Sequence, residues 1–386
     1  MFSQRLPADL RANRLSAAVS ARRASGRPFI DLTLTNPTTA GIRYPENLLA
    51  PLAAVEALRY APEPFGLRIA REAVAADYVR RGTSVAPDRI VLTASTSEAY
   101  SLLFKLICDP GDDVLVPIPS YPLFDHLSRL DAVRVHNYHL EYYGRWMVDG
   151  HSVDAAWSPH TRAVLAVSPN NPTGSSLSGD EWRMLSSRCA ERNAALIVDE
   201  VFADYPLSVG GTHPVEAPAD ALTFRLGGLS KSAGLPQVKL GWVLIDGPAP
   251  LVHDALERLD VICDTYLSVS TPVQVAAPEL IARGAEVREA ILERIRANMA
   301  TLHATAAEYA SVDVLPADAG WSAVLRVPSR QSEEEIVLDL LEREDLLVHP
   351  GYFFDFSHEA FLVVSLLPPP DLFRDGVCRL MDRMHG

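Results

Sequence analysis

Short apolar runs rich in β-branched residues alternate with amphipathic stretches through the middle of the chain. Strands that are buried on both faces of a sheet have this composition. The stretches between them, such as 98–107 and 179–193, have the pattern of helices. We therefore expect right-handed βαβ units that build an α/β fold, with a mainly parallel, seven-stranded-type sheet between layers of helices. The apolar runs are residues 89–95, 113–119, 162–168, 194–200 and 221–227.

A further apolar run, at 240–246, follows the run at 221–227 too closely for a crossover helix. We therefore expect it to be an antiparallel neighbour in the sheet. After about residue 283 a long helical stretch leads into short strands and two more helices, which predicts a smaller α+β domain. Residues 8–26 have the pattern of a short amphipathic helix, and we expect this arm to pack with the small domain. The expected parts are an arm in 1–44, a large domain in 45–282 and a small C-terminal domain in 283–386.

Charge and composition narrow the possible classes of protein. The 386 residues include 35 Lys+Arg and 49 Asp+Glu, which gives a net charge of −14. A chain this acidic lacks the basic surface of a nucleic-acid binder or of a protein that binds anionic membranes. We see no apolar run long enough to span a bilayer and no signal peptide. The four cysteines are far apart and form no CxxC pair, so we expect no metal site and a cytoplasmic location.

Five polar clusters each follow one of the predicted sheet strands. In an open α/β sheet, ligands bind outside the carboxyl ends of the strands. Each cluster alone is a weak signal, but all five converge on one edge of the sheet, which predicts a binding site there. The clusters are STSEAY (95–100), PSYP (119–122), SPNNPTG (168–174), DEVF (199–202) and GLSKSAGLPQVKLG (228–241).

The last two clusters hold a lysine and an acid of the kind that pyridoxal 5′-phosphate (PLP) requires. Lys231 lies in a small-residue turn within an apolar stretch, where a solvated surface charge is hard to explain. Burial would lower its pKa and favour the neutral amine that forms a Schiff base with the cofactor aldehyde. Asp199 ends an apolar strand and could hold the pyridine nitrogen protonated, or it could simply cap the next turn. Lys239, eight residues after Lys231, could pair with the phosphate or could be an ordinary strand-end lysine.

The other clusters offer weaker candidates. Ser95, Thr96 and Ser97 open a predicted helix, whose N-terminal N–H groups and dipole suit a phosphate. They are equally the residues of an ordinary helix cap. Asn171 could donate to the phenolic oxygen of the cofactor, or could belong to a plain Asn-Pro turn. Tyr121 could stack on the ring, or could be a half-buried loop tyrosine.

In order and spacing, SPNNPTG, VDEVF and LSKSAGLPQVKLG resemble three motifs of the fold-type I, PLP-dependent aminotransferases of class I/II. LTASTSEAY and PIPSYP resemble that family's phosphate loop and ring-stacking segment, and the resemblance covers nearly the whole chain. It implies transfer of an amino group between an amino acid and a 2-oxo acid, with Lys231 as general base and acid. It adds Ser230 to the cofactor contacts. It also implies a homodimer, in which Tyr60 and the loop YLSVSTPVQ serve the cofactor of the neighbouring subunit.

Four positions depart from the family pattern, and they change the residues expected to contact the cofactor and the substrate. Phe202, Gly228 and Lys239 stand where the family has tyrosine, often serine, and arginine. Val363 stands where the family has the arginine that grips the substrate α-carboxylate. One replacement is Arg43, in a segment that also contains Asn36 and resembles the loop over the substrate. The other possibility is a substrate held mainly by another group, with Tyr352, Phe353 and Phe354 lining an aromatic pocket.

Two other functions fit parts of the sequence. The same scaffold supports lyase chemistry, such as β-elimination from an amino acid that carries a leaving group. Aminotransferase-like domains also serve as ligand-sensing modules fused to DNA-binding regulators. Such fusions need a basic N-terminal segment, whereas only about 45 residues precede the predicted sheet domain and the chain is acidic.

Overall fold

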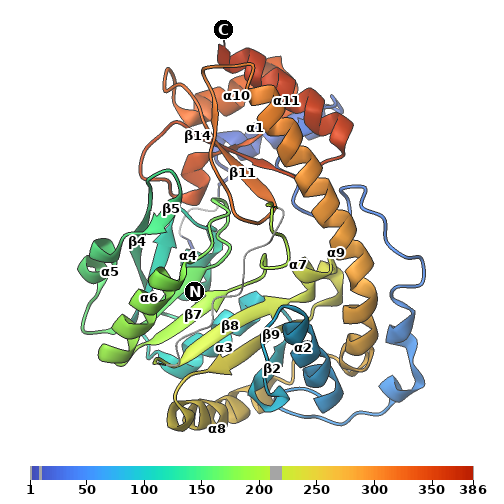
Figure 1. The fold of residues 1–386 in the computed structure, drawn as a ribbon, viewed down its shortest axis with the longest axis vertical. Helices are drawn as coiled ribbons and strands as arrows, with labels where there is room; N and C mark the ends of the chain where they lie inside the picture. The colour runs from blue at the N-terminus through green and yellow to red at the C-terminus, as the bar shows by residue number, and fades with distance from the viewer. Residues whose placement is uncertain (1, 8–10, 209–219, 386) are drawn as a thin grey trace.

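The structure is a computed structural model that describes residues 2–7, 11–208 and 220–385. Its strands form three sheets (Figure 1), and the largest has the order β2-β9-β8-β7-β6-β3-β4-β5. The α/β fold class expected from the sequence is confirmed. The strands of the large sheet are β2 (Ile90–Thr93), β3 (Asp113–Ile118), β4 (Arg134–Tyr142), β5 (Trp146–Val148), β6 (Thr161–Val167), β7 (Ala195–Asp199), β8 (Thr223–Gly228) and β9 (Gly241–Asp246).

The direction of the strands agrees with the sequence pattern. The β4-β3-β6-β7-β8 part of the sheet is parallel, and β9 lies antiparallel between β8 and β2. The described sheet has one strand more than the seven expected, because the short strand β5 forms a hairpin with β4. None of the apolar runs in the sequence corresponds to β4 or β5. Much of β4 is exposed, so it carries no continuous apolar run.

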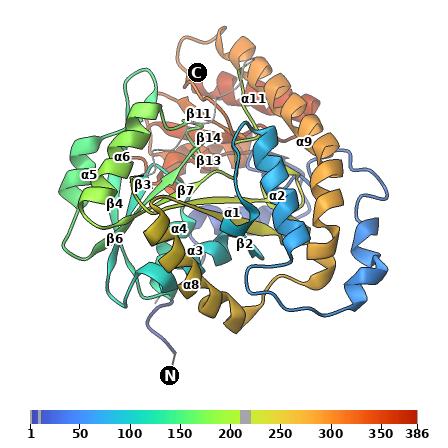
Figure 2. The same ribbon diagram turned by 60° about the horizontal axis from the view of Figure 1, so that its bottom comes forward.

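Helices cover both faces of the large sheet (Figure 2). One apolar core joins the sheet to α3, α4 and α8, and a second joins its other face to α5 and α6. This double cover is why the central strands are apolar on both faces. These helices are α3 (Thr96–Ile107), α4 (Leu123–Leu130), α5 (Gly150–Ala156), α6 (Gly179–Glu191) and α8 (Ala249–Tyr266).

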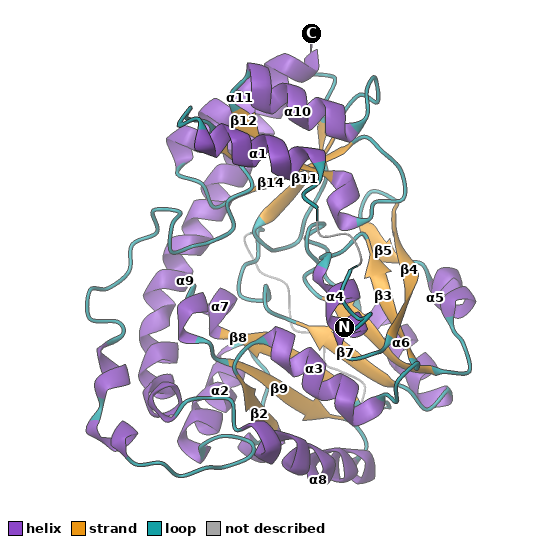
Figure 3. Ribbon diagram, turned by 180° about the vertical axis from the view of Figure 1, so that it is seen from behind, coloured by secondary structure: helices purple, strands orange, loops and turns teal. Residues whose placement is uncertain are grey.

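The helix α9 (Thr271–Ala306) runs along one side of the molecule from the large sheet to the C-terminal region (Figures 1 and 3). It packs against α2 (Arg68–Arg80) and α11 (Pro370–His385). The helix begins earlier than its sequence pattern suggested and continues through Pro278, so it crosses the expected domain boundary at 282/283 without a break.

The C-terminal region contains a four-stranded sheet of order β10-β11-β14-β13 and the helix α10 (Glu333–Arg343). The N-terminal arm packs here as expected: α1 (Arg14–Ala24) contacts α10, and β1 (Ile30–Asp31) pairs with β12 (Leu346–Leu347). The remaining strands are β10 (Asp313–Val314), β11 (Ser322–Arg326), β13 (His349–Pro350) and β14 (Phe361–Ser365). The short helices are η1 (Ala50–Ala53), η2 (Val55–Leu58), η3 (Pro87–Arg89), α7 (Leu229–Ser232), η4 (Pro236–Val238) and η5 (Gly351–Phe354).

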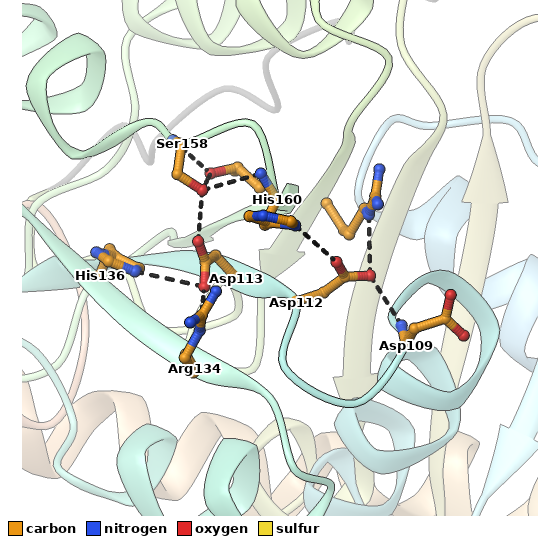
Figure 4. A network of polar contacts seen from close by, with 9 residues as sticks. Asp109, Asp112, Asp113, Arg134, His136, Ser158 and His160 are labelled. Atoms are coloured by element: carbon orange, nitrogen blue, oxygen red, sulfur yellow. Dashed lines mark hydrogen bonds and ion pairs between the residues drawn. The ribbon is translucent and has the colours of Figure 1, made fainter.

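A network of charged groups holds the amino end of β3, at the edge of the sheet away from the five polar clusters (Figure 4). Asp113 accepts hydrogen bonds from Arg134 at 2.7 Å and from Ser158, and its carboxylate lies 3.4 Å from His136. Asp112 accepts a 2.9 Å hydrogen bond from Arg162. The network ties β3 to β4 and β6, so we assign it a structural role.

In the described ranges 2–7, 11–208 and 220–385, every helix is too short or too polar to cross a membrane. No group of three or more His, Cys, Asp or Glu side chains in these ranges is placed to hold a metal ion.

Candidate active site

A cavity of about 370 Å³ opens at the carboxyl ends of the large-sheet strands, between them and the C-terminal sheet. Residues from all five polar clusters line it, so the convergence expected from the topology is seen in the structure. The expected cofactor contacts that line the cavity are Ser95, Thr96, Ser97, Tyr121, Asn171, Asp199, Ser230, Lys231 and Lys239.

Lys231 lies in the single helical turn α7, directly after β8. The hydroxyl of Tyr205 donates a hydrogen bond to the carbonyl oxygen of Lys231, which fixes the turn. The Nζ atom lies 4.8 Å from the ring centre of Trp321 and 5.5 Å from that of Phe202. Burial lowers the pKa of Lys231 to about 8, although the charge of Asp199 opposes the shift. The amine is therefore much easier to deprotonate than an exposed lysine, as a carbonyl-attacking nucleophile requires.

Asp199 is the last residue of β7 and is buried. Its Oδ1 accepts a hydrogen bond from the backbone N–H of Val201 at 3.1 Å, and its Oδ2 accepts one from the hydroxyl of Tyr100 at 2.9 Å. Burial raises the pKa of Asp199 to about 6, and the two hydrogen bonds act against that rise. A buried acid of this kind gains stability when a cationic N–H comes within hydrogen-bond distance.

The N-terminus of α3 points its first residues into the cavity. Ser95 is the N-cap and accepts a 3.1 Å hydrogen bond from the backbone N–H of Glu98, so its hydroxyl serves the helix. Gly241 packs directly against this turn: a Cβ there would lie 3.0 Å from the carbonyl carbon of Ser95 and from Oγ1 of Thr93. The glycine thus allows the helix end to sit close to β9, where backbone N–H groups and the helix dipole suit a phosphate.

The other lining residues complete the cradle. Lys239 adopts a left-handed conformation with φ of 57°, which costs a non-glycine residue roughly 1 kcal/mol. Asn171 accepts a long hydrogen bond of 3.5 Å from Ser322 through its Oδ1. Tyr121 remains 46% exposed at the rim of the cavity. Ser230 lines the cavity beside Lys231.

Five expected site residues, Phe353 among them, lie outside the lining of this cavity. Tyr60 is 71% exposed and lines a different cavity together with Tyr266. The side chain of Asn36 is engaged in its own turn, where Oδ1 accepts hydrogen bonds from the backbone N–H and hydroxyl of Thr38. Arg43 is exposed. Tyr352 is half exposed and packs edge-on against Phe353, and of the expected aromatic trio only Phe354 lines the cavity.

The C-terminal region supplies one wall of the cavity, formed by Trp321, Ser322, His349, Val363 and Ser365. The resemblance placed Val363 near the substrate, but nothing in the sequence singled out Trp321, Ser322 or His349. No arginine occurs among the described residues of the lining. The arginine that the family has at position 363 therefore has no substitute there. Ser365 donates its hydroxyl hydrogen bond to the carbonyl of Leu34, so it serves the fold. The sequence did contain Tyr100, within the STSEAY cluster, but gave no signal of its contact with Asp199.

The residues present fit PLP. The cavity combines a buried lysine of lowered pKa, a buried acid of raised pKa, and a helix N-terminus next to a second lysine. These match the aldehyde, the pyridine nitrogen and the phosphate of the cofactor in number and in chemical type. The fold and the site together therefore define a fold-type I, PLP-dependent transferase.

Comparisons with known proteins agree. The sequence profile of the family "Aminotransferase class I and II" matches residues 46–372, and the chain belongs to this family. The chain is 26% identical over 360 residues to glutamate-pyruvate aminotransferase AlaA of Haemophilus influenzae, covering 88% of this chain and 87% of that protein. It is 25% identical over 358 residues to an alanine aminotransferase of Mycobacterium tuberculosis, covering 89% and 83%.

The fold is similar to that of solved aminotransferase structures. An aminotransferase from Escherichia coli gives a TM-score of 0.87 at 22% identity, covering 100% of this chain and 98% of the other. An aspartate aminotransferase from Thermus thermophilus gives 0.84 at 23% identity, covering 99% of each chain. The protein is a PLP-dependent transaminase. The reported relatives are all aminotransferases by name, and none of them supports the lyase alternative.

Proposed function

We propose that Lys231 holds PLP covalently and moves the proton during amino-group transfer. The observation that carries this proposal is the pair of opposite pKa shifts in one cavity, where Lys231 is lowered to about 8 and Asp199 is raised to about 6. Such pairs, whose environments push their pKa values in opposite directions, are typical of acid-base sites.

Each residue then has a defined task. When bound, the cofactor supplies an electron sink for the bond that breaks at the substrate α-carbon. Asp199 would keep the pyridine nitrogen protonated, and Asn171 would donate to the phenolic oxygen. The N-terminus of α3 and Lys239 would bind the phosphate, and Tyr121 would cover the ring. Lys231, once freed by exchange with the substrate amine, would take the proton from the substrate α-carbon as a neutral amine and deliver it to the cofactor carbon that carried the aldehyde.

We further propose that the amino donor is an amino acid with an uncharged side chain and that a 2-oxo acid is the acceptor. The names of the relatives mention alanine and pyruvate, whose side chain is a methyl group, and also glutamate, whose second carboxylate this proposal does not favour. The cavity wall formed by Leu123, Phe124, Leu127 and Phe354 is apolar, which favours an uncharged side chain. A second carboxylate would find no arginine among the described lining residues.

We propose a homodimer in the cytoplasm. Tyr60 and the loop that begins at Tyr266 lie together around one surface cavity, away from the chain's own PLP site. Several large apolar side chains of the same region are exposed, including Val55, Leu58 and Val261. A second copy of the chain would cover them and would place Tyr60 near its cofactor. The free state of all four cysteines is consistent with a reducing compartment.

Half-reaction spectra test the reaction class. The holoenzyme is mixed with single amino acids in the absence of a 2-oxo acid, and absorbance is followed together with ammonia release. Transamination converts the cofactor to its pyridoxamine form, releases one equivalent of 2-oxo acid and stops. Continuous release of ammonia and 2-oxo acid without the pyridoxamine form would instead support elimination.

A further inference from the structure

The wall of the cavity contributed by the C-terminal sheet contains one titratable side chain, His349, among its described residues. His349 lies in β13, and β13 pairs antiparallel with β14 so that His349 is directly opposite Val363. Residues opposite each other in such a pair project on the same face of the sheet, with Cβ atoms about 5 Å apart. His349 therefore stands beside the apolar position from which an arginine would have reached the substrate.

The imidazole of His349 is poised for a ligand. Its ring packs edge-on against Phe354, with 5.7 Å between ring centres, and is tilted against Phe353 at 5.9 Å. These contacts fix the ring plane without using its nitrogens. Neither nitrogen has a hydrogen-bond partner among the described residues, and the side chain is partly buried in the lining of the cavity. A partly buried imidazole without a protein partner is free to bind a ligand in that cavity.

The charged groups around His349 do not prevent its imidazole from binding a ligand. Asp31 of β1 acts on the imidazole and raises its pKa, while burial lowers the pKa by more. Glu333 of α10, the helix that packs on β13, accepts backbone hydrogen bonds from Tyr352 and Phe361 and is engaged by them. The other packed elements, β14 and η5, contain no charged residue. Across the cavity, Lys231 and Lys239 face the cofactor under the proposed function.

We propose that His349 binds the carboxylate of the amino acid and 2-oxo acid substrates, in place of an arginine at position 363. This inference rests on the proposed function, since it presumes substrates that carry a carboxylate. A carboxylate next to the imidazole favours its protonated form, so the bound pair is a charge-assisted hydrogen bond. A single imidazole N–H replaces the two parallel N–H groups of an arginine. The imidazolium can also lose its positive charge by deprotonation, whereas an arginine keeps its charge.

The loss of this charge sets the direction in which KM for an amino acid changes with pH. Below the pKa of His349 in the complex the imidazolium binds the carboxylate, and above it only a neutral donor remains. KM for an amino acid should therefore rise as pH increases through that pKa, while the affinity for an amine without a carboxylate should not follow the same curve.

The test compares matched ligands on the holoenzyme. The probes are L-phenylalanine with 2-phenylethylamine, and L-alanine with ethylamine, so that each pair differs only in the carboxylate. His349→Phe keeps a packed ring and removes the donor, and His349→Gln keeps a donor that does not titrate. PLP occupancy is measured by absorbance for each variant, and His358→Gln, at an exposed histidine of the same region, is the matched control.

We expect His349→Phe to raise KM for the amino acids roughly 10- to 100-fold, with retained cofactor, and to leave amine binding within about twofold. His349→Gln should flatten the pH dependence of KM. Adding Val363→Arg to His349→Phe should recover affinity for the amino acid. Equal losses for amine and amino acid, or an unchanged KM in both His349 variants, would overturn the proposal.

Failure of the proposed function gives a different result. If the wild-type holoenzyme, with full PLP occupancy, responds to the amines and to none of a panel of amino acids, then its substrates lack a free carboxylate. That outcome contradicts the proposed function and this inference together. An unchanged KM in the variants of an enzyme that does use amino acids contradicts the inference alone.

Discussion

The hydroxyl of Tyr100 donates a 2.9 Å hydrogen bond to Oδ2 of Asp199. Both side chains are buried, and Tyr100 is held edge-on against Phe124 with 5.3 Å between ring centres. Burial, with the Asp199 charge and this hydrogen bond, holds the pKa of Tyr100 well above its usual range, so the phenol remains a donor. A donor to the carboxylate favours its ionised form. Tyr100 therefore helps Asp199 to keep its charge, which under the proposed function lies beside the cofactor nitrogen.

Tyr100→Phe should raise the pKa of Asp199 further above its present value of about 6. A hydrogen bond to a charged group contributes about 1.5–3 kcal/mol, which corresponds to about one to two pKa units. The ¹⁵N chemical shift of the pyridine nitrogen in ¹⁵N-labelled PLP reports its protonation directly. We expect the variant to lose the protonated signal at a lower pH than the wild type.

A matched control for this experiment is Tyr138→Phe. Tyr138 is equally buried and donates to the carbonyl of Leu165 at 2.7 Å, on the other face of the sheet. Its loss should lower stability without moving the ¹⁵N titration. Identical titrations for Tyr100→Phe and the wild type would contradict the assigned role of Tyr100.

The lowered pKa of Lys231 predicts how the cofactor-free protein captures PLP. Only the neutral amine attacks the aldehyde, and burial sets the pKa of Lys231 to about 8 instead of its usual 10.5. The rate of capture, followed by stopped-flow absorbance, should rise with pH and level off above about pH 8. Asp199→Asn removes a charge that raises the pKa of Lys231, so the plateau should begin at lower pH. A rate that still climbs steeply through pH 10 would show that the lysine is not buried as described.

The exposed position of Tyr60 leads to a complementation experiment. Neither a Lys231→Ala chain nor a Tyr60→Phe chain should be fully active alone. In a mixed dimer, one of the two sites combines an intact Lys231 with an intact Tyr60 from the other chain. Partial recovery of activity on mixing supports shared sites, whereas a verified mixed dimer with no recovery counts against them.

The charged network at β3 is expected to stabilise the fold without affecting catalysis. Burial opposes ionisation of Asp113, yet hydrogen bonds from Ser158 and Arg134 outweigh it and hold its pKa below the usual range. Its contribution is therefore present above the unfolded-state pKa of about 3.9 and is lost as pH falls through the folded value.

Asp113→Asn should lower the free energy of unfolding of the holoenzyme by about 1–3 kcal/mol at pH 7, measured by denaturant titration. The difference from the wild type should shrink below about pH 4, and kcat should be unchanged. The exposed Asp125, which lies 3.4 Å from Arg129, is the control, and its Asn variant should cost less than about 1 kcal/mol. A cost that persists unchanged at low pH would assign the effect to packing instead of charge.

The parts of the fold that were predicted are those whose sequence signal is local. The central strands β3, β6, β7 and β8 are buried on both faces, so each appears as one apolar run. The strand β4 lies towards the edge of the sheet, where Arg134, Asn137 and Glu141 are exposed. Its sequence is therefore too polar to show a continuous apolar run. The start of α9 was missed because Pro272 and Pro278 normally indicate a break. Pro272 lies in the first turn, where proline is tolerated, and the helix continues through Pro278 in its interior.

In the candidate site, too, the residues that could be expected from the sequence are those with a local signal. Lys231, Asp199 and Asn171 were expected to lie together because each ends or follows a predicted strand, and parallel strands bring their carboxyl ends together; all three line the cavity. Contacts made across the fold gave no such signal. Tyr100 and Asp199 are 99 residues apart, and the position of His349 opposite Val363 depends on the register of two short strands. Arg43 and Tyr352 were chosen by loop position, and the fold leaves both outside the described lining of the cavity.

Under the proposed function Lys231 carries the cofactor, and borohydride reduction with peptide mass spectrometry tests this role most directly. The purified holoenzyme should show a visible absorbance band that reduction removes, and digestion should give one phosphopyridoxyl adduct, on the peptide that contains Lys231. Lys231→Ala should show neither the band nor the adduct while it retains its fold. An adduct on Lys239 or Lys105, or no adduct on a protein that binds PLP, would show that Lys231 does not hold the cofactor.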